Sequence, residues 1–346
     1  MYKKRSTKEL REEVKATTEK MVKDVDNYTR SPERVKEMLD FMSRFHQYSF
    51  RNQALIRGQR PGATAIGSFK KFKDLGYSVQ KGEKSIRVWA PSTTTEYQFR
   101  NEAGMLVRIP AGQADARIKA MAQEGRAEKK TRERFRLVPV FDATQTNMPV
   151  KDYPKLYPNR PMDYTADPKL VEQLAAATKQ WVKKEQVEEY TVEDLTQSDL
   201  AQFKDEGQKG FSLPGAARQI IAIRDSLPES DKIAVRIHEM AHNALHQDSQ
   251  DGKTTPEREF QAEMTSYVVC KHFGLDTGEN ATKYIAGWTK NGETFESLPV
   301  QERGKMLGDV QKTAKTFINS ISEQLEAQRS QSQTQAKKRE TGLELE

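Results

Sequence analysis

Residues 236–246, RIHEMAHNALH, contain two histidines four positions apart, with a glutamate directly after the first. In a helix, positions i and i+4 lie on one face, so His238 and His242 can present two imidazoles to one metal ion. Glu239 lies on the neighbouring side, where it can take a proton from a water without being a ligand. This is the H-E-x-x-H arrangement of zinc peptidases, in which zinc activates the water and polarises a peptide carbonyl.

The alternative reading of this stretch is an ordinary amphipathic helix that happens to carry histidines. Its apolar positions predict a buried helix: Ile233, Ala234, Ile237, Ala241 and Leu245. Burying two imidazoles and a carboxylate without partners would be costly. A bound metal explains these polar residues better than a satisfied core does, so the sequence predicts one Zn²⁺ per chain.

A catalytic zinc site needs a third protein ligand. A third histidine six residues after the second is ruled out, because position 248 is aspartate. The next predicted helix contains Glu259 and Glu263, four apart and therefore on one face. We expect Glu259 to be the ligand and Glu263 to support a ligand histidine, with an exchange of these two roles as the alternative.

Two further residues near the motif receive structural interpretations. His246 is expected to be a hydrogen-bonded histidine near the helix end, and Cys270 a small buried apolar residue.

The sequence also favours a location in the cytoplasm, because a chain with a single cysteine can form no internal disulfide. The N-terminal stretch lacks an apolar signal-peptide core, and no apolar run approaches the roughly 18 residues of a membrane span, so we expect no membrane partner.

Positive charge is concentrated in one block of the chain. Residues 44–87 hold ten Lys or Arg and two acids, whereas the net charge of the whole chain is +7. Aromatic residues are interleaved with these cations: Tyr48, Phe50, Phe69, Phe72, Tyr77 and Trp89. Cations that follow phosphates and rings that stack on bases predict single-stranded nucleic acid as a partner. The alternative is a solvated basic face with most of the rings in a core.

The patterns predict an α+β protein: a small α/β domain, then a mainly helical zincin-like domain with a short sheet. Four prolines between residues 146 and 163 indicate a domain boundary. We therefore expect a DNA-binding domain over 1–145, a linker over 146–163, a peptidase domain over 164–320 and a polar tail over 321–346 that is either disordered or a frayed helix. The charged residues 114–132 predict a helix, residues 84–91 and 95–100 predict two strands, and RQIIAI at 218–223 predicts a strand that is either internal or an edge for peptide binding.

Several longer stretches resemble a known family. YSFRNQALIRGQRPGA, GSFKKFKDLGYSVQKGEKSIRVWAP and VFDATQT are similar to the N-terminal domain of ArdC-type antirestriction proteins. IHEMAHNALH, EREFQAEMTSYVVCKHFGLDT and YIAGW are similar to the metallopeptidase half of that family, which is related to ImmA/IrrE peptidases. The resemblance covers roughly residues 10–290. Residues 92–135 are longer and more charged than the core of the family, and Gln261 replaces a frequent second glutamate of ImmA-like peptidases.

The resemblance implies an N-terminal domain that binds single-stranded DNA without sequence specificity and a C-terminal zincin domain. It implies carriage on plasmids, conjugative elements or phages, where the protein shields incoming DNA from host restriction. It assigns two sets of residues. The zinc site consists of His238, Glu239, His242 and Glu259, and the DNA contacts are Tyr48, Asn52, Lys81, Lys84 and Arg87.

Three functions follow from these patterns. The first is a zinc metallopeptidase with a single-stranded DNA-binding domain, acting on a protein or peptide substrate that the sequence does not name. The second is a DNA-coating antirestriction protein whose zinc site is structural or unused. The third is a peptidase that cleaves a repressor or another regulator. An intact Glu239 favours the first, because a purely structural site needs no general base.

Overall fold

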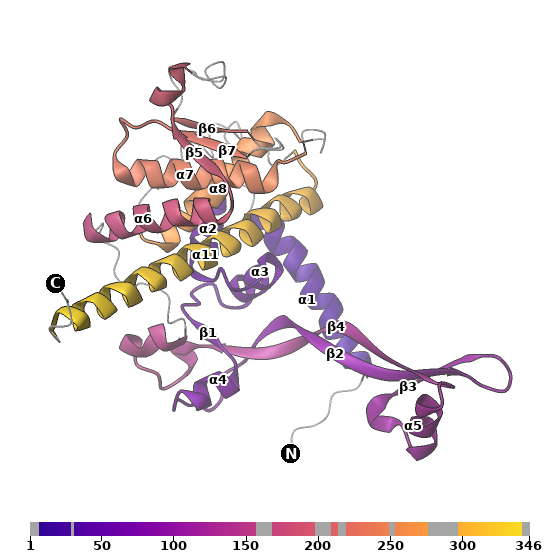
Figure 1. Ribbon diagram of the computed structural model, residues 1–346. Coiled ribbons are helices and arrows are strands. Elements are labelled where there is room, and N and C mark those ends of the chain that lie inside the picture. Colours follow the sequence, from indigo (N-terminus) through magenta and orange to yellow (C-terminus); the bar gives the residue numbers. More distant parts are fainter. Residues whose placement is uncertain are drawn as a thin grey trace. The chain divides into compact units, whose positions relative to one another are not determined.

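The computed structural model describes residues 7–28, 31–156, 168–197, 209–213, 219–248, 253–275 and 297–340 (Figure 1). The fold is α+β and divides into two compact units. The first, called the helical unit here, combines residues 1–65 with residues 148–346, and the second, the strand unit, comprises residues 66–147.

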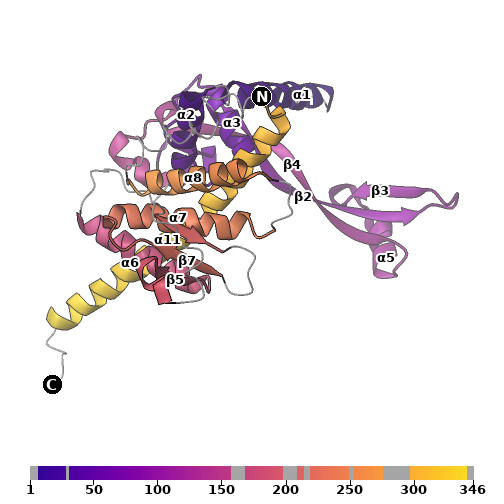
Figure 2. The same ribbon diagram turned by 90° about the horizontal axis from the view of Figure 1, so that it is seen from above.

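The helical unit contains most of the long helices and one small sheet (Figure 2). Its described helices are α1 (Thr7–Tyr28), α2 (Pro32–Arg44), α3 (Phe50–Gln59), α6 (Pro168–Lys184), α7 (Glu229–Leu245), α8 (Thr255–His272) and α11 (Val300–Glu340). Its strands are β5 (Glu188–Thr191), β6 (Gly210–Ser212) and β7 (Ile220–Ile223). β7 lies between parallel β5 and antiparallel β6, so residues 220–223 form an internal strand and the alternative of an exposed peptide-binding edge is wrong for them.

Helix α7 is held by contacts on the side away from its histidines. Ile233 and Ile237 are almost fully buried in the core. The fully buried Arg236 donates two hydrogen bonds to the Glu189 carboxylate of β5, both 2.7 Å, and one to Thr178 of α6 at 3.2 Å. Apolar packing and a two-pronged ion pair therefore fix the rotation of α7 about its axis.

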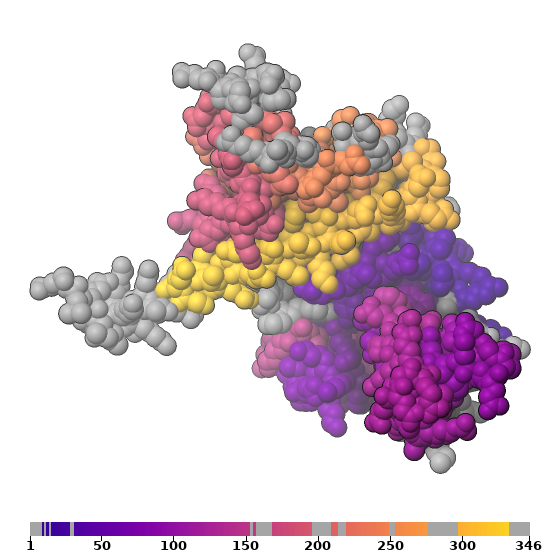
Figure 3. Space-filling model, turned by 45° about the vertical axis from the view of Figure 1, so that its right-hand side comes forward, coloured from indigo at the N-terminus to yellow at the C-terminus, as the bar shows by residue number. Residues whose placement is uncertain are grey.

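The N-terminal helices belong to the same unit as the histidine helix. The Tyr267 hydroxyl of α8 donates to Asp40 of α2 at 2.5 Å, and His272 Nδ1 donates to the Ser43 carbonyl at 2.9 Å. The Gln311 amide of α11 donates to the His46 carbonyl. In Figure 3 the yellow helix α11 runs between the orange helices and the indigo N-terminal helices. The division into compact units thus differs from the predicted DNA-binding domain of residues 1–145, whose first 65 residues lie in the helical unit.

The strand unit is built around a long two-stranded ribbon. Its elements are β1 (Ile66–Gly67), α4 (Phe69–Asp74), β2 (Ile86–Arg100), β3 (Leu106–Pro110), α5 (Ala116–Gln123) and β4 (Glu128–Asp142). The sheet order is β1-β4-β2-β3, antiparallel throughout. Helix α5 covers one face, where Ile118 packs with Tyr97 and Ala114. Residues 101–104 form the turn between β2 and β3, with Gly104 at a φ of +75°.

Two expectations about this unit are wrong. The helix predicted over 114–132 ends at Gln123, and Gly125, at a φ of +75°, turns the chain into β4 from Glu128. The two strands predicted over 84–91 and 95–100 are one strand, β2. Pairing between β2 and β4 along thirteen residues makes both strands longer than the local sequence pattern predicts.

The C-terminal stretch is helical, which agrees with the helical alternative for the polar tail that begins at residue 321. α11 continues to Glu340, and Ile321 and Leu325 are buried. Those apolar residues pack into the core and stabilise the helix beyond the predicted boundary. Residues 341–346 and the linker residues 157–163 lie outside the described chain. Among the described helices, none combines the length and apolar character needed to cross a bilayer.

Candidate metal centre

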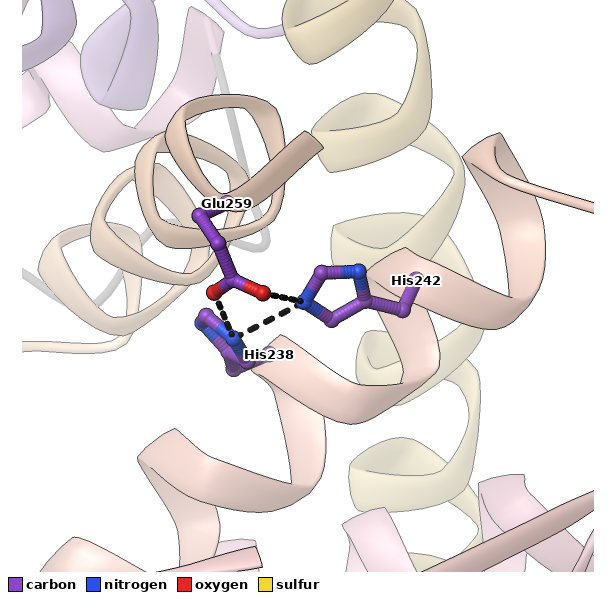
Figure 4. A group of neighbouring side chains, drawn as sticks. All are labelled: His238, His242 and Glu259. Carbon is purple, nitrogen blue, oxygen red and sulfur yellow. Dashed lines mark hydrogen bonds and ion pairs between the residues drawn. The ribbon is translucent and has the colours of Figure 1, made fainter. Parts of the chain in front are cut away.

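The three predicted ligands meet between α7 and α8 (Figure 4). The Nε2 atoms of His238 and His242 are 3.1 Å apart. The Glu259 carboxylate points at both: Oε2 is 3.4 Å from His238 Nε2 and Oε1 is 3.4 Å from His242 Nε2. Helical spacing on α7 aligns the imidazoles, and α8 supplies the carboxylate from across the helix pair.

The donor set fits a single divalent ion. Donors held at about 2.0–2.1 Å by one tetrahedral zinc lie roughly 3.3 Å from one another. The three separations here are 3.1, 3.4 and 3.4 Å. Two neutral imidazoles and one carboxylate are also a ligand set that zinc accepts. No rearrangement of the helices is needed to bring these three side chains onto one ion.

The other ring nitrogen of His238 faces a second carboxylate. Glu263 Oε2 lies 3.2 Å from His238 Nδ1, one helical turn beyond Glu259. Burial lowers the pKa of His238, but hydrogen bonds to Glu259 and Glu263 and the charge of Glu239 outweigh it and raise the pKa to about 10. For Glu259 the effect of burial has the opposite sign and raises the pKa. The hydrogen bonds of this carboxylate to both histidines nevertheless hold its pKa below the ordinary value. The metal-free cluster therefore carries a protonated His238 between two carboxylates.

His242 is oriented by a longer chain of hydrogen bonds. Its Nδ1 lies 3.0 Å from Nδ1 of His246, whose Nε2 lies 3.4 Å from the side-chain Oε1 of Gln261. The Gln261 amide donates to Asp309 of α11 at 3.4 Å. If Nε2 of His242 is a ligand, its proton is on Nδ1, and the chain then runs in one direction from His242 to Asp309.

Sequence reasoning missed this chain. It treated His246 as a satisfied histidine at the helix end, which agrees with its burial but overlooks its contact with His242. The signal was available, because His246 follows His242 by the same four residues that separate His242 from His238. Burial and the neighbouring His242 lower the pKa of His246 to about 4, which keeps its ring neutral and able to accept a hydrogen bond.

The remaining residue of the motif, Glu239, is buried beneath β6. Its carboxylate accepts a hydrogen bond from Ser212, and burial raises its pKa against the opposing charges of His238 and His242. β6 approaches α7 closely at Gly210, where an added Cβ would lie 2.7 Å from the Ala222 carbonyl oxygen and 3.3 Å from Glu239 Oε1. A glycine at this position lets the edge strand lie directly over the glutamate.

The predicted DNA contacts are divided between the two units. Tyr48 is half-buried and Asn52 is buried at the start of α3 in the helical unit. Lys81 and Lys84 are exposed in the strand unit. Arg87 is half-buried there, and its guanidinium donates to the Leu137 carbonyl at 3.3 Å. The five residues therefore do not form a single cluster within either unit, and their role in DNA binding remains a prediction.

Comparisons with known proteins identify the N-terminal region. The sequence model of the N-terminal domain of anti-restriction factor ArdC matches residues 2–141. An uncharacterized protein of Bacillus anthracis is 34% identical over 97% of the chain, which spans 56% of the length of that relative.

Two crystal structures of the antirestriction ArdC protein from the R388 plasmid are also similar, both at 16% identity over 80% of this chain. The metal-free structure has a TM-score of 0.42 with 85% of that chain covered, and the Mn(II)-bound structure 0.37 with 84% covered.

Proposed function

We propose that this chain, which is ArdC-type in its N-terminal region, is a zinc-dependent metallopeptidase that also binds single-stranded DNA and protects the DNA of a mobile element from host restriction. The observation that carries the enzymatic part is the meeting of His238, His242 and Glu259 with a separate, buried Glu239 beside them. A metal that only stabilised the fold would need the first three residues and not the fourth.

In this proposal, different residues of the site bind the metal, orient its ligands and transfer the proton. His238, His242 and Glu259 hold the ion, and Glu263 and His246 fix the orientation of the two imidazoles through their second nitrogens. When bound, zinc supplies Lewis-acid polarisation of the peptide carbonyl and activation of a water. Glu239 accepts the proton of the attacking water and returns it to the leaving amine, and its raised pKa suits a group that must do both.

The decisive experiment compares wild type with Glu239→Gln. Metal content, measured by elemental analysis of the purified protein, is expected to be one zinc per chain in both. Cleavage of casein or of the protein itself, with and without single-stranded DNA, is expected only in wild type. Glu229→Gln, the same substitution at the start of α7, is the matched control and should cleave normally. Cleavage by Glu239→Gln at the wild-type rate would refute the assignment.

A second function rests on the N-terminal family match alone. The match to the ArdC N-terminal domain covers residues 2–141 and none of the metal ligands. This second function is that of a DNA-coating protein whose antirestriction effect needs no proteolysis. Under that function, Glu239→Gln would protect unmodified plasmid DNA from restriction as well as wild type does. Loss of protection in Glu239→Gln, with DNA binding retained, would favour the peptidase.

A further inference from the structure

The ribbon of the strand unit has two chemically different faces. Residues directly opposite each other on paired antiparallel strands share a face, and alternate residues along a strand point to opposite faces. On one face of β4, four consecutive outward positions are all basic; this basic stripe consists of Lys130, Arg132, Arg134 and Arg136. None of the four belongs to the basic block at residues 44–87.

Acidic neighbours compensate two of the four charges of the basic stripe, because Glu96 of β2 lies beside Arg132 and Lys130 Nζ is 3.7 Å from Glu128 of β4. Arg136, Arg134 and Arg132 lie opposite the small, uncharged residues Ala90, Ser92 and Thr94. Glu96 lies opposite Lys130 and is 3.1 Å from Arg132 Nε. Within the described residues, Arg134 and Arg136 lie in no ion pair. Both are exposed.

The stripe is also accessible. Helix α5 covers the other face of the ribbon, where Tyr97 packs with Ile118. Along the outer edge of β4, the only described pairing is with β1 at residues 141 and 142. Alternate residues of a strand are roughly 6.8 Å apart, so four cations follow a line of about 20 Å.

We propose that the basic stripe is a contact surface for the phosphate backbone of single-stranded DNA. A row of regularly spaced cations matches a polymer with regularly spaced anions better than it matches the irregular charges of a folded protein. No aromatic residue lies on this face between Lys130 and Arg136, so the stripe contacts phosphates and does not stack on bases. This inference rests on the proposed DNA binding and assigns it a surface that sequence analysis did not predict.

The test is the salt dependence of DNA binding by the full chain. Each phosphate contact contributes about 0.7 to the slope of log affinity against log salt for single strands. Changing all four stripe residues to glutamine should therefore reduce the slope by roughly 2.8. Between about 50 and about 200 mM salt, the affinity of this variant for a labelled oligothymidylate should then fall roughly 50-fold less than that of wild type.

Two further variants make the result specific. The matched control removes the same charge from exposed positions of α6 in the helical unit: Lys169→Gln, Lys179→Gln, Lys183→Gln and Lys184→Gln. Its slope should equal that of wild type. Arg132→Lys, Arg134→Lys and Arg136→Lys together keep the charge and should also retain the wild-type slope. Melting curves and metal content of all variants verify folding independently of DNA.

Three outcomes would overturn the proposal. An unchanged slope in the glutamine variant of the stripe would show that DNA binds elsewhere and would leave the proposed DNA binding intact. An equal loss in the α6 control would show that only net charge matters. Failure of wild type to bind oligothymidylate at low salt would refute both the stripe and the proposed DNA binding, while leaving the peptidase assignment to its own test.

Discussion

The helical and strand units use charged side chains in opposite ways. In the helical unit, Arg236 is fully buried against Glu189, and Arg303 is 5% exposed against Asp26. In the strand unit, the basic stripe is exposed, and its one described cross-strand ion pair, Arg132 with Glu96, leaves Arg132 37% exposed. Arg236 and Arg303 thus lie in a fixed, largely buried environment, whereas the arginines of the basic stripe lie in a solvated one.

This difference determines which chemistry each unit supports. Charges held by packing keep the same geometry and shift each other's protonation, as the cluster around His238 does. Such a cluster can hold a metal and move a proton. Charges in solvent are screened by salt and act collectively, which suits binding to a flexible polyanion. Substitutions should therefore affect stability and metal binding in the helical unit, and salt-dependent binding in the strand unit.

The largest expected effect on stability comes from comparing two arginine–glutamate pairs. Arg236→Leu leaves the Glu189 carboxylate without its two-pronged partner and should lower the free energy of unfolding by about 3 kcal/mol. Arg132→Leu breaks an exposed pair and should cost less than about 1 kcal/mol. Urea denaturation followed by circular dichroism measures both. Equal costs would mean that burial does not distinguish the two units.

A smaller effect on stability is expected from a substitution at Gly210, where β6 lies over α7. In Gly210→Ala, the new methyl group would lie 2.5 Å from Val235 Cγ1 and 2.7 Å from a backbone oxygen, so β6 must shift. We expect a loss of about 1–3 kcal/mol and reduced cleavage, because Ser212 moves away from Glu239. Gly308→Ala in α11 is the control. No atom lies within 4 Å of its added Cβ, and it should stabilise the helix by up to about 1 kcal/mol.

The sequence was most informative where a short-range pattern decides the structure. The buried helix that carries His238 and His242, and the convergence of these residues with Glu259, follow from spacing within a helix or between neighbouring helices. Periodicity places residues on faces, and two helices joined by a short connection bring those faces together.

Long-range packing could not be predicted in the same way. The charged stretch at 128–136 is a strand because β2 pairs with it, and residues 1–65 join the helical unit because Asp40 and Ser43 contact α8. Neither partner can be inferred from local composition. The same limitation explains the missed Gln261–Asp309 contact, since Asp309 lies 48 residues away on α11.

The chain of hydrogen bonds behind His242 gives a third prediction. His246→Leu removes the acceptor for His242 Nδ1–H and should weaken metal binding by about 10- to 100-fold. His246→Asn retains an acceptor oxygen and should recover part of that affinity. Competition with a zinc chelator at fixed pH measures both variants. Equally reduced metal affinities in the His246→Leu and His246→Asn variants would indicate that His246 only fills space. A metal affinity unchanged from wild type in both variants would exclude any role of His246 in positioning His242.

The last prediction is a pH dependence that separates the two units. The pKa of His238 is raised to about 10 in the metal-free protein, so at pH 7 its ring is protonated and the proton must leave before Nε2 can bind a metal. Metal affinity should therefore rise about tenfold per pH unit from pH 6.5 to 8.5, whereas a histidine with an ordinary pKa near 6.5 would level off within that range. Chelator competition at several pH values measures the slope. The Glu263→Gln substitution removes one of the carboxylates that raise the pKa of His238, so the metal affinity of this variant should level off at lower pH.

Binding of the basic stripe to oligothymidylate should stay constant over the same pH range, because arginine remains charged throughout it. A metal affinity that does not change with pH would contradict the protonated cluster, and DNA binding that follows the metal curve would mean that the two units do not act independently.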